Sequence, residues 1–137
     1  MRFMVLVKAD ALSETGALPS SELMTAMGQY NQQLIEAGVM QAGKGLQPSS
    51  KGARLHFANG EVAAFDGPFE VDNGLIAGFW LWTAVSLAEA TEWAMKAPFQ
   101  DATLEIRQIY EMEDFGNALT PAAQAQETAQ RERLSGK

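Results

Sequence analysis

The chain has 137 residues, of which 47% are hydrophobic and 20% are charged, and it contains no cysteine. This length and composition are typical of one globular domain that buries its own core. The absence of cysteine excludes disulfides, thiol nucleophiles and thiolate metal sites. The single histidine, His56, excludes a multi-histidine metal site within one chain. We therefore expect neither a metal nor a cofactor.

The formal net charge is −7 at pH 7. Sequence-independent binding to nucleic acid or to an anionic membrane depends on basic surface, so neither partner is expected. No apolar run approaches the roughly 18 residues that indicate a membrane span. Residues 1–8 alternate like a strand and lack the layout of a signal peptide, which predicts a cytoplasmic location.

The first third of the chain predicts a strand, a loop and a helix. Residues 2–8 alternate so that both faces of the strand are apolar, which is typical of a strand inside a sheet. Residues 9–19 are polar and aperiodic, which indicates a loop. Ser20 and Ser21 supply a helix cap and Gly38 ends the helix. Its apolar stripe is expected to pack in the core: Leu23, Met24, Met27, Tyr30, Leu34 and Ile35.

A short strand and a hairpin follow. Residues 39–46 form a strand in which Gly43 and Gly45 indicate a bulge or a close approach of the backbone to another group. Residues 53–58 and 61–65 alternate on either side of Asn59-Gly60, a strong signal for a hairpin turn. Arg54 and His56 share the polar face of the first hairpin strand.

The stretch from Asp66 to Phe69 leads into the most apolar segment of the chain, residues 75–83, which predicts a central strand. A carboxylate beside buried surface can work as a general acid or base. The alternative is that Asp66 caps the turn by accepting hydrogen bonds from backbone amides. Trp80 and Trp82 share one face of the strand, where they line a ligand pocket or are buried against a partner subunit.

The last third predicts a helix, a strand and a polar tail. Ser86 and Glu89 form a capping box that opens a helix running to Pro98. Residues 103–112 form the final strand, where Glu105 and Arg107 are placed to pair as an ion pair. The segment 114–137 has almost no apolar stripe, so we expect a polar tail that is helical or mobile, outside the domain of residues 1–113.

The order strand, helix, strand, hairpin, strand, helix, strand predicts an α+β, ferredoxin-like sandwich with an inserted β-hairpin. In this arrangement the helices cover one face of the sheet. The other face carries Met4 and Leu6 together with either the two tryptophans or Phe79 and Leu81. So much exposed apolar surface is costly in water, and a twofold homodimer that packs sheet against sheet would cover it.

Several motifs in the same order resemble the YCII-related family, also called the DGPF-domain family. The motifs are Gly45-Leu46-Gln47-Pro48, Asp66-Gly67-Pro68-Phe69, the run from Leu75 to Trp80, and Leu104-Glu105-Ile106-Arg107. The resemblance covers about residues 1–113. It implies the dimeric α/β-barrel version of the ferredoxin-like fold, and it matches Asp66 to the aspartate of the family.

The resemblance says less about activity. The His-Asp pair suspected of catalysis in smaller relatives has no matching histidine here, and residues 71–74 depart from the pattern that often follows the motif. Some longer members are linked to alternative sigma factors, which implies a regulatory or accessory role.

Three functions stay open. The first is a small-molecule enzyme of lyase or isomerase type with Asp66 as general acid or base and Arg54 or Arg107 orienting an anionic or phenolic substrate. The second is a non-catalytic ligand-binding or accessory dimer, and the third is a structural or regulatory dimer. The expected substrate-binding residues lie around Asp66 in the predicted pocket: Arg54, His56, Phe69, Trp80 and Arg107.

Overall fold

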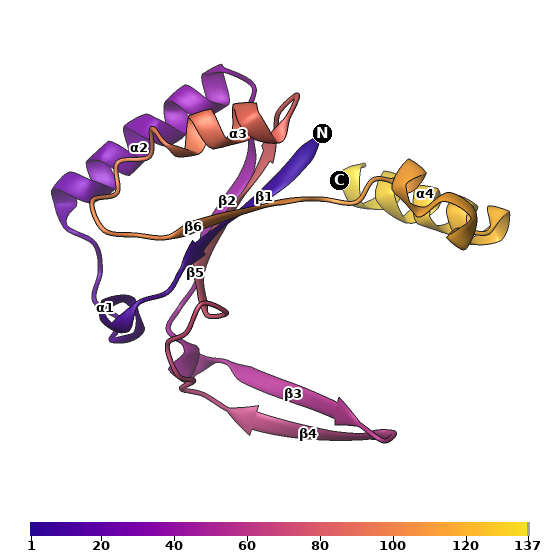
Figure 1. Ribbon diagram of the computed structural model, residues 1–137, viewed down its shortest axis with the longest axis horizontal. Coiled ribbons are helices and arrows are strands. Elements are labelled where there is room, and N and C mark those ends of the chain that lie inside the picture. The colour runs from indigo at the N-terminus through magenta and orange to yellow at the C-terminus, as the bar shows by residue number, and fades with distance from the viewer. Residues whose placement is uncertain (137) are drawn as a thin grey trace.

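The computed structural model describes residues 1–136 (Figure 1). Its helices and strands, in chain order, are β1 (Arg2–Lys8), α1 (Ala11–Glu14), α2 (Ser21–Glu36), β2 (Met40–Gly45), β3 (Ala53–Ala58), β4 (Glu61–Asp66), β5 (Ile76–Thr83), α3 (Leu87–Ala94), β6 (Leu104–Gln108) and α4 (Pro121–Ser135). Short 3-10 helices span Ser49–Lys51 and Met112–Ala118.

The main sheet has four antiparallel strands in the order β2-β5-β1-β6, and β3 and β4 form a separate hairpin. When the hairpin is set aside, the two central strands β5 and β1 are flanked by β2 and β6, which is the ferredoxin-like arrangement. The predicted α+β class and inserted hairpin are therefore confirmed. Within residues 1–136 the sheet stays open and does not close into a barrel.

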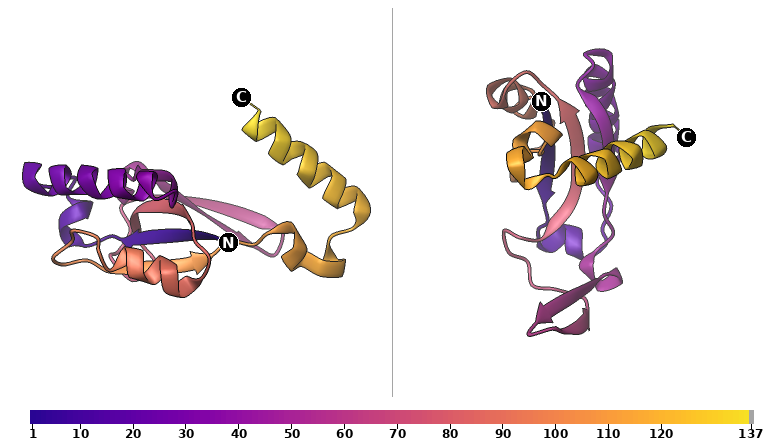
Figure 2. Two further views of the ribbon diagram at one scale, coloured as in Figure 1. Left: turned by 90° about the horizontal axis from the view of Figure 1, so that it is seen from above. Right: turned by 90° about the vertical axis from the view of Figure 1, so that its right-hand side faces the viewer.

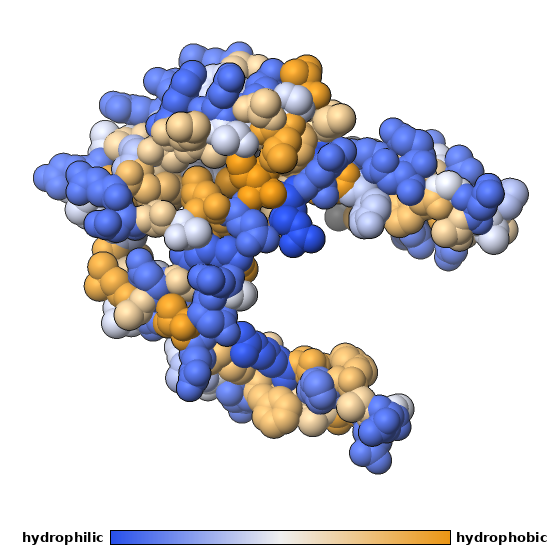
Figure 3. All heavy atoms as spheres, in the orientation of Figure 1, coloured by the Kyte–Doolittle hydropathy of each residue, from blue (hydrophilic) through white to orange (hydrophobic). Residues whose placement is uncertain are grey.

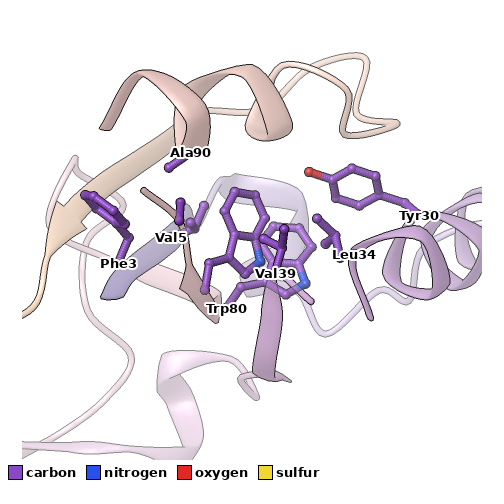
Figure 4. Packing of buried hydrophobic residues seen from close by; sticks show 9 residues of the cluster. Phe3, Val5, Tyr30, Leu34, Val39, Trp80 and Ala90 are labelled. Carbon is purple, nitrogen blue, oxygen red and sulfur yellow. The ribbon is translucent and has the colours of Figure 1, made fainter. Parts of the chain in front are cut away.

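The core lies between the sheet and the helices α2 and α3, which cover the same face (Figure 4). Phe3 and Val5 of β1 and Trp82 of β5 are almost completely buried there, together with Leu34 of α2 and Ala90 of α3. The tryptophans thus face the helices. Phe79 and Leu81 share the uncovered face with Met4 and Leu6, because they are register partners across β1 and β5.

The stripe predicted along α2 is only partly buried. Tyr30 and Leu34 are buried, but Met24 and Ile35 are 57% and 53% exposed. A helix that lies on a sheet buries a narrow stripe, and the two exposed residues fall on its flanks. Including them in the core was wrong.

Capping side chains determine where the helices α1 and α2 begin. Ser20 accepts a hydrogen bond from the Leu23 amide at 3.1 Å and opens α2 as predicted. The predicted loop 9–19 instead contains the short helix α1, because Asp10 and Ser13 form a capping box. The helix α3 ends at Ala94, earlier than the sequence pattern indicated.

The hairpin and α4 project from the body of the molecule on the same side and leave open space between them (Figures 1 and 2). Every residue of β3 and β4 is exposed, and α4 has no buried residue. Among residues 1–136, no helix is both long and apolar enough to cross a membrane.

Candidate functional site

The turn from Asp66 to Phe69 is held by backbone contacts with the segment 49–52. The Gly67 amide donates to the Gly52 carbonyl at 3.0 Å, and the Phe69 amide donates to Ser49 Oγ at 2.9 Å. A Cβ atom on Gly67 would lie 1.7 Å from the Ser49 carbonyl oxygen, so only glycine fits at this position. The turn is therefore fixed by Gly67 and by its partners on the neighbouring segment.

The Asp66 carboxylate takes no part in that fixation. Asp66 ends β4 opposite Ala53 and is exposed, so it does not lie against buried surface as expected. Within residues 1–136 its side chain makes no hydrogen bond or ion pair, and the turn-capping role is not observed. The carboxylate faces water with both oxygens available to another group.

The sequence pattern did not indicate a role for Glu14 and Ser49, which also hold this region together. The Ser49 amide donates to Glu14 Oε2 at 2.9 Å, and the Ser49 hydroxyl donates to Glu14 Oε1. Glu14 ends α1, so α1 connects through Ser49 to the turn at Phe69. The capping pair Asp10 and Ser13 was the sequence signal that could have identified this helix.

Two of the predicted binding residues meet at the base of the hairpin. The Arg54 guanidinium lies over the Phe69 ring, 4.1 Å from its centroid, a cation–π contact. Both side chains line a shallow groove of about 420 Å³, together with Gln47, Ser49 and Lys51. This groove is open to solvent and lies beside the end of β4.

The other predicted residues lie elsewhere. His56 is exposed in the middle of β3, opposite Ala63. Arg107 lies on the uncovered sheet face, where it pairs with Glu105 at 3.3 Å as predicted. Hydrogen bonds from Lys8 and then from Arg107 hold the pKa of Glu105 below its ordinary value. Within one chain, the six predicted residues do not converge on one site.

Trp80 lines a different and better enclosed pocket, between α2 and the sheet. Its volume is about 260 Å³, and it is bordered by α2, β1, β2, β5 and the loop that carries Phe99. The side chains on the helix-covered side of this lining are mostly apolar: Val7, Met27, Met40, Trp80 and Phe99. Asn31 and Lys44 are the polar residues of the lining.

The Trp80 ring is held in a defined position. Its indole Nε1 donates to Asn31 Oδ1 at 3.0 Å. The Tyr30 and Phe99 rings pack against it at centroid distances of 5.9 and 6.3 Å. A Cβ on Gly43 would lie 2.8 Å from the ring, so the predicted close approach at this glycine is made by Trp80.

The pocket is built for contact with apolar surface. The Asn31 carbonyl is occupied by Trp80, which leaves the Asn31 amide group as a donor. Tyr30, beneath Trp80, donates its hydroxyl to the Trp93 carbonyl at 2.6 Å, and burial raises its pKa to about 12. Tyr30 is therefore protonated at neutral pH. No carboxylate or histidine is among the residues that line the pocket.

No metal centre is indicated by the acidic residues and His56. Residues 1–136 contain no group of three or more histidine, cysteine, aspartate or glutamate side chains placed to hold an ion.

The family model of the YCII-related domain matches residues 1–113. The chain belongs to the YCII-related family. A comparison with curated proteins found no match. Among solved structures, the chain is similar to 5-chloro-2-hydroxyhydroquinone dehydrochlorinase from Burkholderia phenoliruptrix AC1100, in complex with 2,5-dihydroxybenzoquinone. That similarity has a TM-score of 0.44 at 17% identity and covers 82% of this chain and 98% of the other.

Membership of the YCII-related family agrees with the motifs that suggested it, because Asp66 to Phe69 and the run into β5 both lie inside the matched range. The helix α4 lies outside that range.

Proposed function

We propose that this YCII-related protein binds a small molecule in the pocket between α2 and the sheet. The observation that supports the proposal is the pocket itself, an aromatic and thioether-lined space of about 260 Å³ with a fixed tryptophan and one free amide donor. Mostly apolar walls with a few placed polar groups are the usual makeup of a ligand site.

The size and lining favour one substituted ring as the ligand. An apolar cavity of about 150 Å³ is large enough to hold benzene, so the present volume leaves space for ring substituents. Trp80 and Phe99 offer aromatic faces and edges to such a ring. The Asn31 amide provides a donor for a hydroxyl or a carboxylate, which fits the phenolic or anionic class expected from the sequence.

Phenol, benzoate and cyclohexanol test this proposal as probes. We expect tryptophan fluorescence to report saturable binding of phenol or benzoate, with weaker binding of cyclohexanol because it lacks the aromatic ring. Asn31→Ala removes the donor and the Trp80 contact and should weaken binding by about 5-fold or more, the value of one hydrogen bond. Gln32→Ala, on the next and exposed position of α2, should leave binding unchanged. Failure of all three probes at millimolar concentration contradicts the proposal.

A second candidate is catalysis by Asp66 as the general acid or base of a lyase or isomerase. Its support is the position of a free carboxylate on a turn fixed through Gly67 and Ser49, beside the groove that Arg54 and Phe69 line. Asp66 does not line the pocket that contains Trp80. The non-catalytic binding role is therefore our first proposal.

Asp66→Asn separates the two roles once a turnover is found with any bound compound. If Asp66 moves a proton, the variant should keep its free energy of unfolding and lose about 100-fold or more in kcat. Asp101→Asn, an exposed loop aspartate, is the control. Full turnover by Asp66→Asn would exclude the catalytic role and leave ligand binding in place.

We also propose that the protein acts as a homodimer. The uncovered face of the sheet carries the apolar side chains Met4, Leu6, Phe79 and Leu81, and no element of residues 1–136 covers it as α2 and α3 cover the other face. These four side chains are partly exposed, and apolar patches on a protein surface indicate interfaces. Sedimentation equilibrium should give the mass of two chains at micromolar concentration, and a single-chain mass would contradict the dimer.

A further inference from the structure

The hairpin β3–β4 has an apolar face that its own chain leaves uncovered. Leu55, Phe57 and Val62 share this face, because Leu55 pairs with Ala64 and Phe57 pairs with Val62. Their exposed fractions are 59%, 74% and 55%. The space-filling view shows apolar and polar side chains next to each other on the hairpin (Figure 3). An isolated two-stranded hairpin is at best marginally stable in water, so this one needs a further surface to pack against.

The hairpin is nevertheless held in a fixed direction at its base. The Gly67 amide is bonded to the Gly52 carbonyl, and the strand that leaves the hairpin is bonded through Phe69 to Ser49 and onward to Glu14. The first bond joins the two ends of the hairpin, and the bonds at Ser49 connect those ends to α1. They point the hairpin away from α2, α3 and the sheet instead of letting it fold back onto them (Figure 1).

The solvent-accessible surface area of the chain indicates how much surface a partner could bury. The chain exposes 9932 Å². A compact monomer of 14.8 kDa is expected to expose about 7,000 Å², so this chain exposes about 3,000 Å² more. Obligate homodimers bury about 2,000–5,000 Å² summed over both chains, which is about 1,000–2,500 Å² per chain, so the excess is large enough to contain such an interface.

A second copy also accounts for where the uncovered surfaces lie. The apolar sheet face and the apolar hairpin face belong to the same chain, and the hairpin and α4 extend past the body on one side with a gap between them (Figures 1 and 2). A twofold axis brings the same two surfaces of both chains into one interface. The hairpin of each chain can then cover apolar surface of the other.

We infer that the β3–β4 hairpin is an intersubunit arm, whose face of Leu55, Phe57 and Val62 is buried against the body of a second copy of this chain. The inference rests on the proposed homodimer and specifies how it is built. It is independent of the ligand pocket.

Thiol protection tests the arm directly, because the natural chain has no cysteine. Val62→Cys places a thiol on the apolar face, and Ala63→Cys places one on the opposite face of the same strand as the matched control. We expect the reaction with a thiol reagent to slow about 10-fold or more at Val62→Cys as protein concentration rises through the dimer dissociation constant. The rate at Ala63→Cys should not change.

Phe57→Asp provides the second measurement. Placing a charge in a buried contact should raise the dimer dissociation constant about 100-fold, while near-ultraviolet circular dichroism still reports the packed tryptophans of the body. Ala63→Asp should change the dissociation constant less than about 3-fold.

Two results would overturn the inference. A dimer whose Val62→Cys thiol reacts equally fast at every concentration shows that the hairpin is not the contact, although the dimer stands. A chain that is monomeric at all concentrations removes both the arm and the dimer. If Phe57→Asp does not fold, the thiol rates alone decide.

Discussion

At the scale of single residues, the turn from Asp66 to Phe69 depends on Gly67 more than on Asp66. The Gly67 backbone lies so close to the Ser49 carbonyl that a methyl group has no space. The Ser49 hydroxyl accepts a hydrogen bond from the Phe69 amide and donates one to the Glu14 carboxylate. One glycine thereby lets a turn, a 3-10 helix and α1 meet at a single serine.

Gly67→Ala should therefore destabilise the protein. Forcing a methyl group into this contact requires the turn to separate from Ser49, with an expected loss of about 1–3 kcal/mol in the free energy of unfolding, the usual range for overpacking. Urea denaturation followed by circular dichroism measures it. Gly45→Ala is the control, because a Cβ there meets nothing within 4 Å. Equal stability of the two variants would contradict the steric account.

At the scale of elements, Glu111 joins β1 to the segment that leads into α4. The Arg2 guanidinium donates twice to the Glu111 carboxylate, with both distances 2.8 Å. Arg131 of α4 approaches the same carboxylate at 3.9 Å. The hydrogen bonds from Arg2 hold the pKa of Glu111 below its ordinary value, which is partly offset by burial.

The sign of the pH dependence follows from that lowered pKa. The stabilisation is complete above the pKa of the unfolded chain, about 4.3, and it disappears as the pH falls through the lower folded value. Glu111→Gln should cost about 0.5–1 kcal/mol at pH 7 and less at pH 2.5, as measured by urea denaturation. Glu113→Gln, an exposed neighbour, should show no such difference. A cost that persists undiminished at pH 2.5 would exclude the ion pair as its source.

At the scale of the whole molecule, the chain is a sheet body with two projecting parts that differ in chemistry. The hairpin is apolar on one face, whereas α4 is polar and has no buried residue (Figure 3). The contacts of α4 with the preceding segment are the Arg131 approach to Glu111 and a 3.7 Å contact from Thr128 Oγ1 to Met112 Sδ. Burial, which stabilises a helix, is therefore almost absent from this one.

Deletion of residues 119–137 should leave the fold intact. Because α4 buries little, the melting temperature should fall by less than about 5 °C, the shift expected for at most 1 kcal/mol. Differential scanning calorimetry of the shortened and full chains measures it. A loss of soluble protein, or a much larger fall, would show that α4 packs against a partner.

The sequence by itself determined the strands, the hairpin turn and the helix caps. The turn at Asn59-Gly60 adopts positive φ at both residues, and Ser20 and Ser86 cap α2 and α3, because these choices depend on chemistry within a few residues. The apolar character of both faces of β1 and β5 likewise predicted that these two strands lie inside the sheet. The capping pair that forms α1 was equally local, but the polar composition of 9–19 concealed it.

Only the tertiary structure decided what those elements bring together. The pocket combines Asn31, Gly43, Trp80 and Phe99 from segments far apart in the chain, and no local spacing relates them. Asp66 and Trp80 were expected to share one site. They lie on different surfaces, because the hairpin turns away from the sheet at Gly67. Which face of β5 meets the helices depended on register with β1 and on the position of α2, both of which are set by long-range packing.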